Sequence, residues 1–442
     1  MKFNKWTLGL AAVGAVSMAS AVRAEETPTL SPVETALSST TISGYVSASA
    51  SWQISPSGNN TLGSPAAAIP YQNGKQDTFN LDVVKVSIAK PQDESPWASG
   101  YQVDLLFGPD AVGYNPSANA QTTVSTTVGG TKYSASGATL SDFGIKQAYV
   151  ALRTPIGNGI DWKIGVFDTI IGYEVTDAGS NPNYTRSWGY AVEPTEHTGI
   201  LATYKISDMF TVSAGIADTL TAGINNYNNG WGNSYFGSKA FMGSVTFTAP
   251  SSCGWAAGSS LYAGMVYGYG SQNDNGTPVI PNQAGNQVNY YAGATLNTPW
   301  KPLTVGAAFD YVQNLYGGGD SANFHVDVTV FGLYATIKAT DKLSFSARGE
   351  YAEENAVNYG SDNSIELTGT MEYDLWANVI SRLEVRYDHV ISGTDAGSNG
   401  YYTPNNFGVG SGNGSQLNSI TGTAFPVERS SVGVYANLIY KF

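Results

Sequence analysis

The stretch SSVGVYANLIYKF, residues 430–442, alternates between two kinds of side chain over its whole length. From Val432 onward its even-numbered positions are apolar, namely Val432, Val434, Ala436, Leu438, Tyr440 and Phe442. Successive side chains of a β-strand point to opposite faces of a sheet, so a period of two predicts a strand with one apolar face. Strict alternation over about ten residues is typical of a strand in a transmembrane β-barrel.

The same period recurs along the chain, and no amphipathic helix interrupts it. We expect about 16 strands, near 41–53, 78–90, 98–108, 142–153, 160–170, 196–206, 209–218, 238–249, 258–270, 286–298, 302–313, 323–338, 342–353, 363–375, 377–390 and 429–442. In the second strand the apolar positions change from odd to even numbers between Val83 and Val84. That change of parity predicts a β-bulge, because one extra residue reverses which face a side chain joins.

The connections between these strands alternate between short and long. Short ones fall at 91–97, 155–159, 207–208, 250–255, 299–301, 340–341 and around 376, and long ones at 54–77, 109–141, 171–195, 219–237, 271–285, 314–322, 354–362 and 391–428. Outer-membrane barrels combine short periplasmic turns with long extracellular loops. The sequence therefore predicts an all-β, antiparallel, up-and-down transmembrane barrel of about 16 strands, with 14 and 18 as the alternatives.

Composition agrees with this class and excludes others. Only 12% of the 442 residues are charged, against about 25% in an average soluble chain. No stretch of the body has 18 consecutive apolar residues, which excludes a helical membrane protein. The single Cys253 excludes a disulfide scaffold, and the formal charge of −13 argues against nucleic acid as a partner.

The chain divides into three parts. Residues 1–24 combine Lys2 and Lys5 with a short apolar region and small residues before Ala24, which is typical of a cleaved signal peptide. Residues 25–40 contain Pro28 and Pro32 among Ser and Thr, and we interpret them as a periplasmic linker. Residues 41–442 form the predicted barrel, which the signal peptide would direct to export and on to the bacterial outer membrane.

Aromatic residues lie where strands are expected to end. The candidates for an aromatic girdle are Trp97, Trp162, Trp255, Trp300, Trp376 and Phe442. Indole rings prefer the membrane interface, although strand-end aromatics of a soluble β-protein are the alternative. The apolar strand that ends in Phe442 is also similar to the terminal strand that the barrel assembly machinery recognises.

Several motifs suggest a family. They are ISGYV (42–46), VDLLFGPD (103–110), GVFDTIIGYE (165–174), NPNYTRS (181–187) and EPTEHTG (193–199). Together they resemble the β-barrel porin type 2 (OmpL-like) family of Gram-negative outer membranes, over about residues 42–442. The resemblance implies a porin-like channel and assigns no chemistry to particular residues.

Charged residues of three consecutive strands fall on the face opposite the apolar one. These pore-lining candidates are Arg348, Glu350, Glu366, Glu372, Asp374, Arg382, Glu384, Arg386 and Asp388. On the lipid face each Arg would cost about 2–4 kcal/mol at mid-depth, so we expect them on the inner wall. There they would either set a field across the channel or only pair with one another.

The connection 171–195 has two interpretations that the sequence leaves open. It carries Glu174, Asp177, Asn181, Arg186 and Glu193, which could constrict a channel if the segment folds inward. The alternative is an ordinary surface loop.

We predict a porin for passive diffusion of small hydrophilic solutes or ions, with a modest cation preference from the net acidity. The alternatives are a substrate-specific channel, with Tyr45 and Tyr435 as aromatic contacts, and a plugged structural or adhesive barrel. No catalytic residue is predicted, because G-x-S-x-G is absent. No metal site or cofactor is predicted either, since the three His are far apart. The expected partners are outer-membrane lipid, the barrel assembly machinery and solutes, and a homo-oligomer is left open.

Overall fold

The computed structural model describes residues 39–54, 69–72, 75, 79–111, 121–128, 131–138, 143–218, 220, 224, 239–270, 285–315, 326–356, 360–393, 415–417, 424–426 and 430–442. The predicted signal peptide and nearly all of the predicted linker lie outside these residues. No helix within them is long and apolar enough to cross a bilayer.

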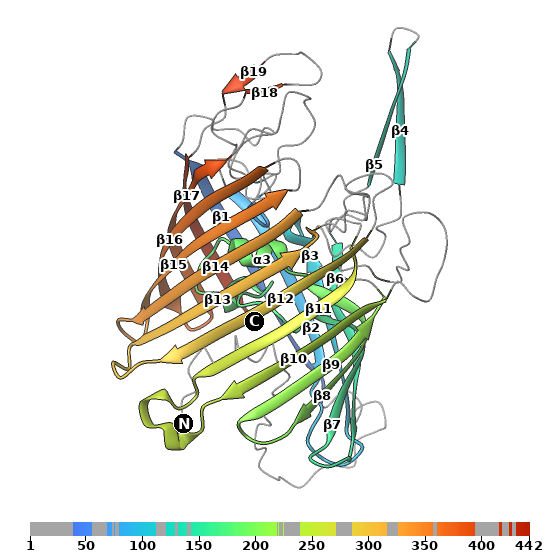
Figure 1. Cartoon of the computed structure of the whole chain (residues 1–442), viewed down its shortest axis with the longest axis vertical. Coiled ribbons are helices and arrows are strands. Elements are labelled where there is room, and N and C mark those ends of the chain that lie inside the picture. The colour runs from blue at the N-terminus through green and yellow to red at the C-terminus, as the bar shows by residue number, and fades with distance from the viewer. Residues whose placement is uncertain are drawn as a thin grey trace.

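Sixteen antiparallel strands form a closed barrel, which confirms the predicted fold class. In order around the barrel they are β1 (Thr41–Gln53), β2 (Phe79–Lys90), β3 (Ser99–Phe107), β6 (Phe143–Thr154), β7 (Ile160–Asp168), β8 (Glu196–Lys205), β9 (Phe210–Ala217), β10 (Ala240–Thr248), β11 (Ser260–Gly270), β12 (Gly285–Asn297), β13 (Leu303–Gln313), β14 (Val326–Lys338), β15 (Leu343–Ala356), β16 (Gly360–Trp376), β17 (Val379–Gly393) and β20 (Ser430–Lys441). The first and last strands pair and close the barrel, with Tyr45 opposite Lys441. The strands are strongly tilted (Figure 1).

The predicted bulge lies in β2. Along the β1–β2 ladder Ser47 is opposite Val83, but the next residue, Ala48, is opposite Leu81. Asp82 is therefore the extra residue of the bulge. Its side chain is almost fully buried and accepts hydrogen bonds from the hydroxyl groups of Ser47 at 2.9 Å and Ser49 at 2.7 Å. The change of parity thus turns a carboxylate toward the inside of the barrel.

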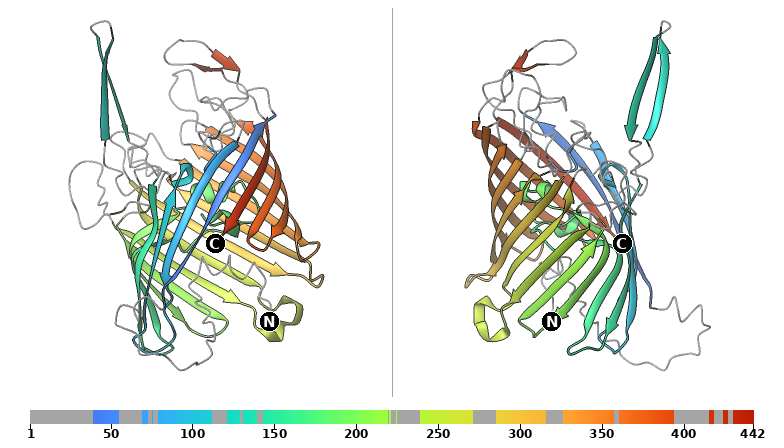
Figure 2. Two further views of the ribbon diagram at one scale, coloured as in Figure 1. Left: turned by 180° about the vertical axis from the view of Figure 1, so that it is seen from behind. Right: turned by 45° about the vertical axis from the view of Figure 1, so that its right-hand side comes forward.

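Two small hairpins stand apart from the barrel. One consists of β4 (Gln121–Val128) and β5 (Thr131–Ala138), and the other of β18 (Ser415–Leu417) and β19 (Ala424–Pro426). Figures 1 and 2 show both beyond the end of the barrel opposite the short turn that contains the 3-10 helix η4 (Ser251–Ala256). We expected plain connections here. The sequences QTTVSTTV and TKYSASGA have no apolar face, so alternation could not reveal these strands.

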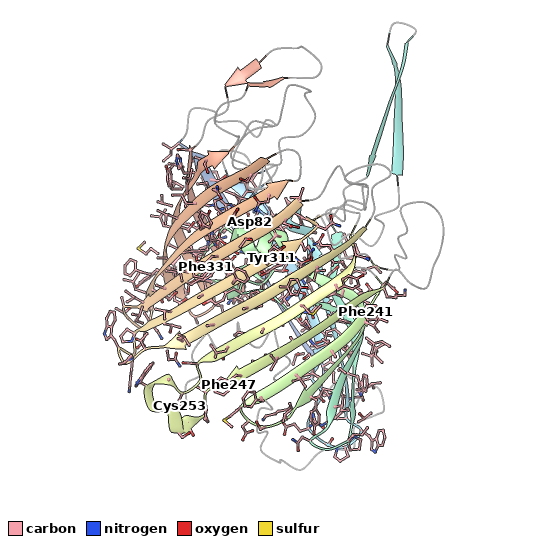
Figure 3. All side chains as sticks on the ribbon, viewed as in Figure 1. Asp82, Phe241, Phe247, Cys253, Tyr311 and Phe331 are labelled. Atoms are coloured by element: carbon pink, nitrogen blue, oxygen red, sulfur yellow. The ribbon has the colours of Figure 1, made fainter. Side chains whose placement is uncertain are left out.

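The outer surface of the barrel is apolar. Phe241, Phe331 and Leu367 are 51%, 44% and 56% exposed there, and Figure 3 labels the first two on the outside of their strands. An apolar belt of this kind is what a lipid-facing surface requires.

The candidate girdle residues take two kinds of position. Trp97, Trp255, Trp300 and Trp376 are exposed, at or beside the short connections, and Phe442 is exposed where β20 ends. Trp162 differs, since it lies within β7 and is half-buried. Its indole N–H donates a hydrogen bond of 3.0 Å to the Thr154 hydroxyl.

An arginine at the middle of the outer belt should destabilise the barrel. Leu367 lies midway along β16, and Leu367→Arg should cost about 2–4 kcal/mol of the free energy of unfolding, because the charge meets hydrocarbon. Trp376→Arg, at the end of the same strand, should cost only about 0–1 kcal/mol. Urea unfolding in phospholipid vesicles measures both variants. Equal costs for the two would contradict a lipid-facing belt centred on Leu367.

Candidate functional site

One long connection folds into the barrel. Residues 169–195, which we name the inserted segment, join β7 to β8 and contain the 3-10 helix η3 (Ala178–Ser180) and the helix α3 (Trp188–Val192). Figures 1 and 2 show α3 inside the ring of strands. The amide of Thr169 donates to the carbonyl of Thr195 at 3.1 Å, so the two ends of the segment meet at the wall.

The inserted segment also needs one particular glycine. Gly172 has a φ of +111°, in the region that favours glycine. A Cβ at this position would lie 2.3 Å from Oε2 of Glu193, at the other end of the segment. Glycine therefore lets the beginning and the end of the segment approach each other closely.

Three arginines of the wall bind backbone carbonyls of the inserted segment. Arg348 on β15 donates to the carbonyl of Thr185 at 2.8 Å, and Arg386 on β17 donates to that of Arg186 at 2.6 Å. Arg382 on β17 donates to the carbonyls of residues 178 and 181, each at 2.8 Å. Buried carbonyls outside regular structure need such partners. The guanidinium groups therefore supply the hydrogen-bond donors that backbone amides would provide in a helix or sheet.

Two carboxylates of the wall bind backbone amides of the same segment. Glu384 on β17 accepts from the amides of Tyr184 at 2.6 Å and Thr185 at 2.9 Å. Glu350 on β15 accepts from the amide of Trp188 at 2.7 Å, in the first turn of α3. The positive end of a helix favours an anion at this place. The wall therefore forms hydrogen bonds with both the backbone amides and the backbone carbonyls of the segment.

Arg348 is the centre of this contact. Its guanidinium lies 2.7 Å from Glu174 of the inserted segment and 3.2 Å from Glu366 on β16, and all three side chains are fully buried. Glu350 is 3.6 Å away. One arginine therefore contacts three carboxylates away from water, and its removal would leave Glu174 without this ion pair and Glu366 with only Arg386 at 3.9 Å.

The nine pore-lining candidates are on the inner faces of β15, β16 and β17. Seven of them are almost completely buried, namely Arg348, Glu350, Glu366, Arg382, Glu384, Arg386 and Asp388. Glu372 and Asp374, near the short connections, are partly exposed, and Glu372 accepts from Arg382 at 2.9 Å. Five of these seven contact the inserted segment directly, namely Arg348, Glu350, Arg382, Glu384 and Arg386. Glu366 and Asp388 pair with Arg348 and Arg386 on the wall. The strand pattern did not reveal the segment as a partner.

The neighbouring wall, formed by β20, β1 and β2, holds the segment as well. Asp177 pairs with Lys85 on β2 at 2.8 Å, and the hydroxyl of Tyr45 lies 3.4 Å from the same carboxylate. The rings of Tyr184 and Tyr435 are 5.7 Å apart. Tyr45 and Tyr435, which we considered as members of an aromatic track for solutes, are buried against the inserted segment.

The remaining contacts of the inserted segment are apolar. Trp188 and Val192 of α3 belong to one buried cluster with Val312 on β13 and Val326, Val328 and Val330 on β14. Ile170 and Ile171 belong to another with Phe167, Leu201, Met242 and Val266 of the neighbouring wall. The segment therefore spans the interior, with ion pairs toward β2 and β15–β17 and apolar packing toward β7–β14.

The candidate constriction residues take separate roles. Glu174, Asn181 and Arg186 are buried, and Asn181 binds the backbone of Val175 through both its amide oxygen and nitrogen. Glu193 faces the carboxyl group of Asp310 on β13. Burial, together with the negative charge of Asp310, raises the pKa of Glu193 well above its usual range. Two carboxyl groups therefore meet where the segment returns to the wall.

An open space remains below the segment. A cavity of about 300 Å³ lies at the end of the barrel with the short connections, between the β2–β3 connection and the inner faces of β6 to β9. Its lining includes Gln92, Arg153, Lys163 and Thr203. These residues were not among the predicted pore-lining positions, because isolated polar and charged residues on separate strands give no local pattern.

Comparisons with known proteins agree with this architecture. The model of the family described as "Putative beta-barrel porin-2, OmpL-like" matches residues 39–426. Among solved structures, OmpT of Vibrio cholerae has a TM-score of 0.51 at 12% identity, over 91% of this chain and 97% of its own. The anion-selective porin of Comamonas acidovorans has a TM-score of 0.52 at 12% identity, over 91% and 99%. The channel DcaP of Acinetobacter baumannii gives 0.52 at 12%, over 91% and 97%.

Comparison with curated protein sequences gives no match. The solved structures establish the fold alone, since their identities are low, whereas the family match covers most of the chain. The closed antiparallel barrel of this chain matches the fold of these outer-membrane structures. The chain therefore belongs to the putative beta-barrel porin-2, OmpL-like family and is a porin of the outer membrane.

Proposed function

We propose that this porin is a narrow channel for passive diffusion of small hydrophilic solutes, and that the inserted segment is its constriction. The observation that supports this most is the double attachment of residues 169–195. Arg348 and Lys85 hold the segment by ion pairs, and Trp188 packs on the wall of β14. A segment held on several sides leaves less room for solutes than an open barrel, so the limit on solute size should be strict.

We further propose that the chain is a channel without enzymatic activity or cofactor. Its partners would be the outer-membrane lipid around the apolar belt and the solutes inside. The barrel assembly machinery would recognise it through the alternating outer face of β20. Residues 1–24 would be removed after export, and residues 25–40 would remain as a periplasmic linker. Association with copies of itself stays a prediction.

Ion preference is a separate part of the proposal. A modest preference for cations follows from the formal charge of −13. The charges of the inner wall are mixed, and several carboxylates there are paired with arginine or lysine. Total charge is therefore a weak guide, and the reversal potential decides the preference.

A second candidate function is a plugged structural or adhesive barrel. The close packing of α3 against β13 and β14 favours it. Val312, Val326 and Val328 are fully buried there, so no water-filled space separates α3 from this part of the wall. The two candidates differ in one property, which is whether ions pass through the folded protein.

Conductance of the mature, detergent-refolded protein in a planar bilayer tests the proposal. We expect stable current steps of uniform size, and we expect liposomes with the protein to swell faster in glycerol than in glucose or sucrose. Asymmetric KCl gives the reversal potential. Absence of current from protein that is demonstrably folded and inserted would refute the channel and favour the plugged barrel. Current blocked by one solute alone would instead indicate a substrate-specific channel.

A further inference from the structure

The cavity of about 300 Å³ near the short connections contains a lysine with no ionic partner. Lys163 on β7 lines it, half-buried, and its Nζ lies 4.8 Å from the centre of the Tyr149 ring on β6. Within the described ranges of the chain, no carboxylate or carbonyl lies at hydrogen-bond distance from this Nζ. A Lys ammonium has three N–H donors, so the cavity receives a charge and donors that the protein leaves unused.

The nearest acids cannot serve this lysine, because each is already paired. Asp104 and Asp168 act on Lys163 through their charges alone. Asp104 lies 3.0 Å from Lys85, and Asp168 pairs with Lys146. The lysine is therefore not the second half of an ion pair that a small movement would complete.

The acid next to Lys163 on the inner face of β7 is also neutralised. Asp161 accepts two hydrogen bonds from Arg153, at 2.7 and 2.8 Å, and a third from the amide of Gln92. The second guanidinium nitrogen of Arg153 donates to the carbonyl of Asn158 at 2.7 Å. Arg153 and Asp161 thus satisfy each other, and on this face of β7 Lys163 is the charge that remains available to a ligand.

The balance of charge around the cavity fixes the charge of a ligand. Four basic and three acidic side chains line it, and Lys205, one of the basic ones, pairs with Asp208 outside the lining, so the local charge is close to balanced. A partly desolvated ammonium gains most from an anion with which it can form a charge-assisted hydrogen bond. A ligand with one negative charge satisfies it, whereas a second negative charge would meet the acidic side chains.

The rest of the lining is polar. It includes Gln102, Thr203 and Thr211 beside Tyr149 and Ala151. Hydroxyl groups of a ligand could therefore form hydrogen bonds with the amide and hydroxyl groups of these side chains. A volume of about 300 Å³ is at the lower end of the range of small-molecule sites.

We propose that this cavity binds a small hydroxylated monocarboxylate, with its carboxylate on the Lys163 ammonium. Binding at the site does not depend on conduction. Its use as a subsite for solutes that pass through the barrel rests on the proposed channel function. An anion site at Lys163 runs against the cation preference expected from the total charge, because the binding group here is an ammonium.

Isothermal titration calorimetry on the detergent-refolded mature protein tests the proposal with three ligands that share a six-carbon chain and differ in charge. Glucitol is neutral, gluconate carries one negative charge and glucarate carries two. We expect gluconate to bind one to one and at least about tenfold more tightly than glucitol, and also more tightly than glucarate. Equal binding of gluconate and glucitol, or no binding of gluconate by folded protein, would overturn the proposal. So would chloride that competes as strongly as gluconate.

Variants locate the site. Lys163→Gln should weaken gluconate binding about tenfold or more and leave glucitol unchanged, while Lys163→Arg should keep most of the affinity. Lys338→Gln is the matched control, because Lys338 is 47% exposed, pairs with Asp341 and does not line the cavity. Unchanged gluconate binding by folded Lys163→Gln protein would refute the assignment. Gluconate binding by protein that conducts no current would keep the site and reject the channel.

Discussion

Replacing Arg348 with methionine should release the inserted segment and raise the single-channel conductance several-fold. The change removes the ion pairs with Glu174 and Glu366 and the hydrogen bond to the carbonyl of Thr185. Loss of one partner of a buried ion pair typically costs about 3–5 kcal/mol, because the other charge stays buried alone. Here several carboxylates would be left, so repulsion would add to the lost attraction.

The barrel itself should survive this substitution. Arg348 is on β15, whose backbone ladder with β14 and β16 does not depend on the side chain. In detergent gels the protein should migrate more slowly after heating than before, and this difference reports the folded barrel. Proteolysis within residues 169–195 reports the released segment. Lys338→Met is the control, since Lys338 forms only an exposed pair with Asp341 at 3.9 Å. Wild-type conductance and protease resistance in Arg348→Met would show that Arg348 does not hold the segment.

Removal of the carboxylates that Arg348→Met leaves without a partner should lower the conductance again. If Glu174→Gln and Glu366→Gln are added to Arg348→Met, no uncompensated carboxylate remains from these two pairs. Replacing both partners of a buried interaction costs less than replacing one. The triple variant should therefore conduct less than Arg348→Met alone. A conductance equal to that of Arg348→Met would indicate that the hydrogen bonds to Thr185, and not the charges, hold the segment.

The strands of the barrel could be predicted because the lipid acts on every second side chain in the same way. The last strand was expected at 429–442 and is found at Ser430–Lys441. The bulge at Asp82 was predicted from the change of parity between Val83 and Val84, although Val83 itself is buried inside the barrel. The hairpin of β4 and β5 was missed because strands outside the membrane need no apolar face.

The partners of the inner charges could not be predicted in the same way. Alternation places Arg348 and Glu384 on the inner face, but it does not say whether water or protein lies opposite. Their partners, Glu174 and Thr185, lie 174 and 199 positions away along the chain. No local pattern connects residues so distant.

One signal for the inserted segment was present in β14. Val326, Val328 and Val330 face inward, while Phe331 and Leu333 face outward, so this strand is apolar on both faces. An inner face of valines does not suit a water-filled lumen and indicates that protein packs there. The structure places Trp188 and Val192 of α3 against these valines. Apolar character on both faces of a barrel strand is thus a useful sign of an inserted segment.

Conductance should rise with pH in the wild-type protein, and Glu193 should account for most of the rise. Burial and the neighbouring Asp310 hold the pKa of Glu193 well above its ordinary value of 4.5 while the segment is docked. A released segment would return that pKa toward 4.5. Below this pH the carboxyl group is protonated in both states, so it favours neither. Above it the docked state must keep a proton that the released state loses, which costs docking about 1.4 kcal/mol per pH unit until Glu193 ionises in place.

Glu193→Gln tests this sign directly. Glutamine carries no charge at any pH and can still donate a hydrogen bond to Asp310, so the docked state should persist and most of the rise in conductance between about pH 5 and 9 should be lost. The control is Glu94→Gln, in the connection between β2 and β3, which lies away from the inserted segment and should keep the wild-type profile. Single-channel recording across this range, with the buffers matched in ionic strength, gives the three profiles. If Glu193→Gln retains the wild-type slope, other groups must titrate, and the pair of Glu193 and Asp310 does not govern docking. If most of the slope is lost only in Glu193→Gln, a proton shared between Glu193, which directly follows α3, and Asp310 on β13 sets how firmly the constriction is held.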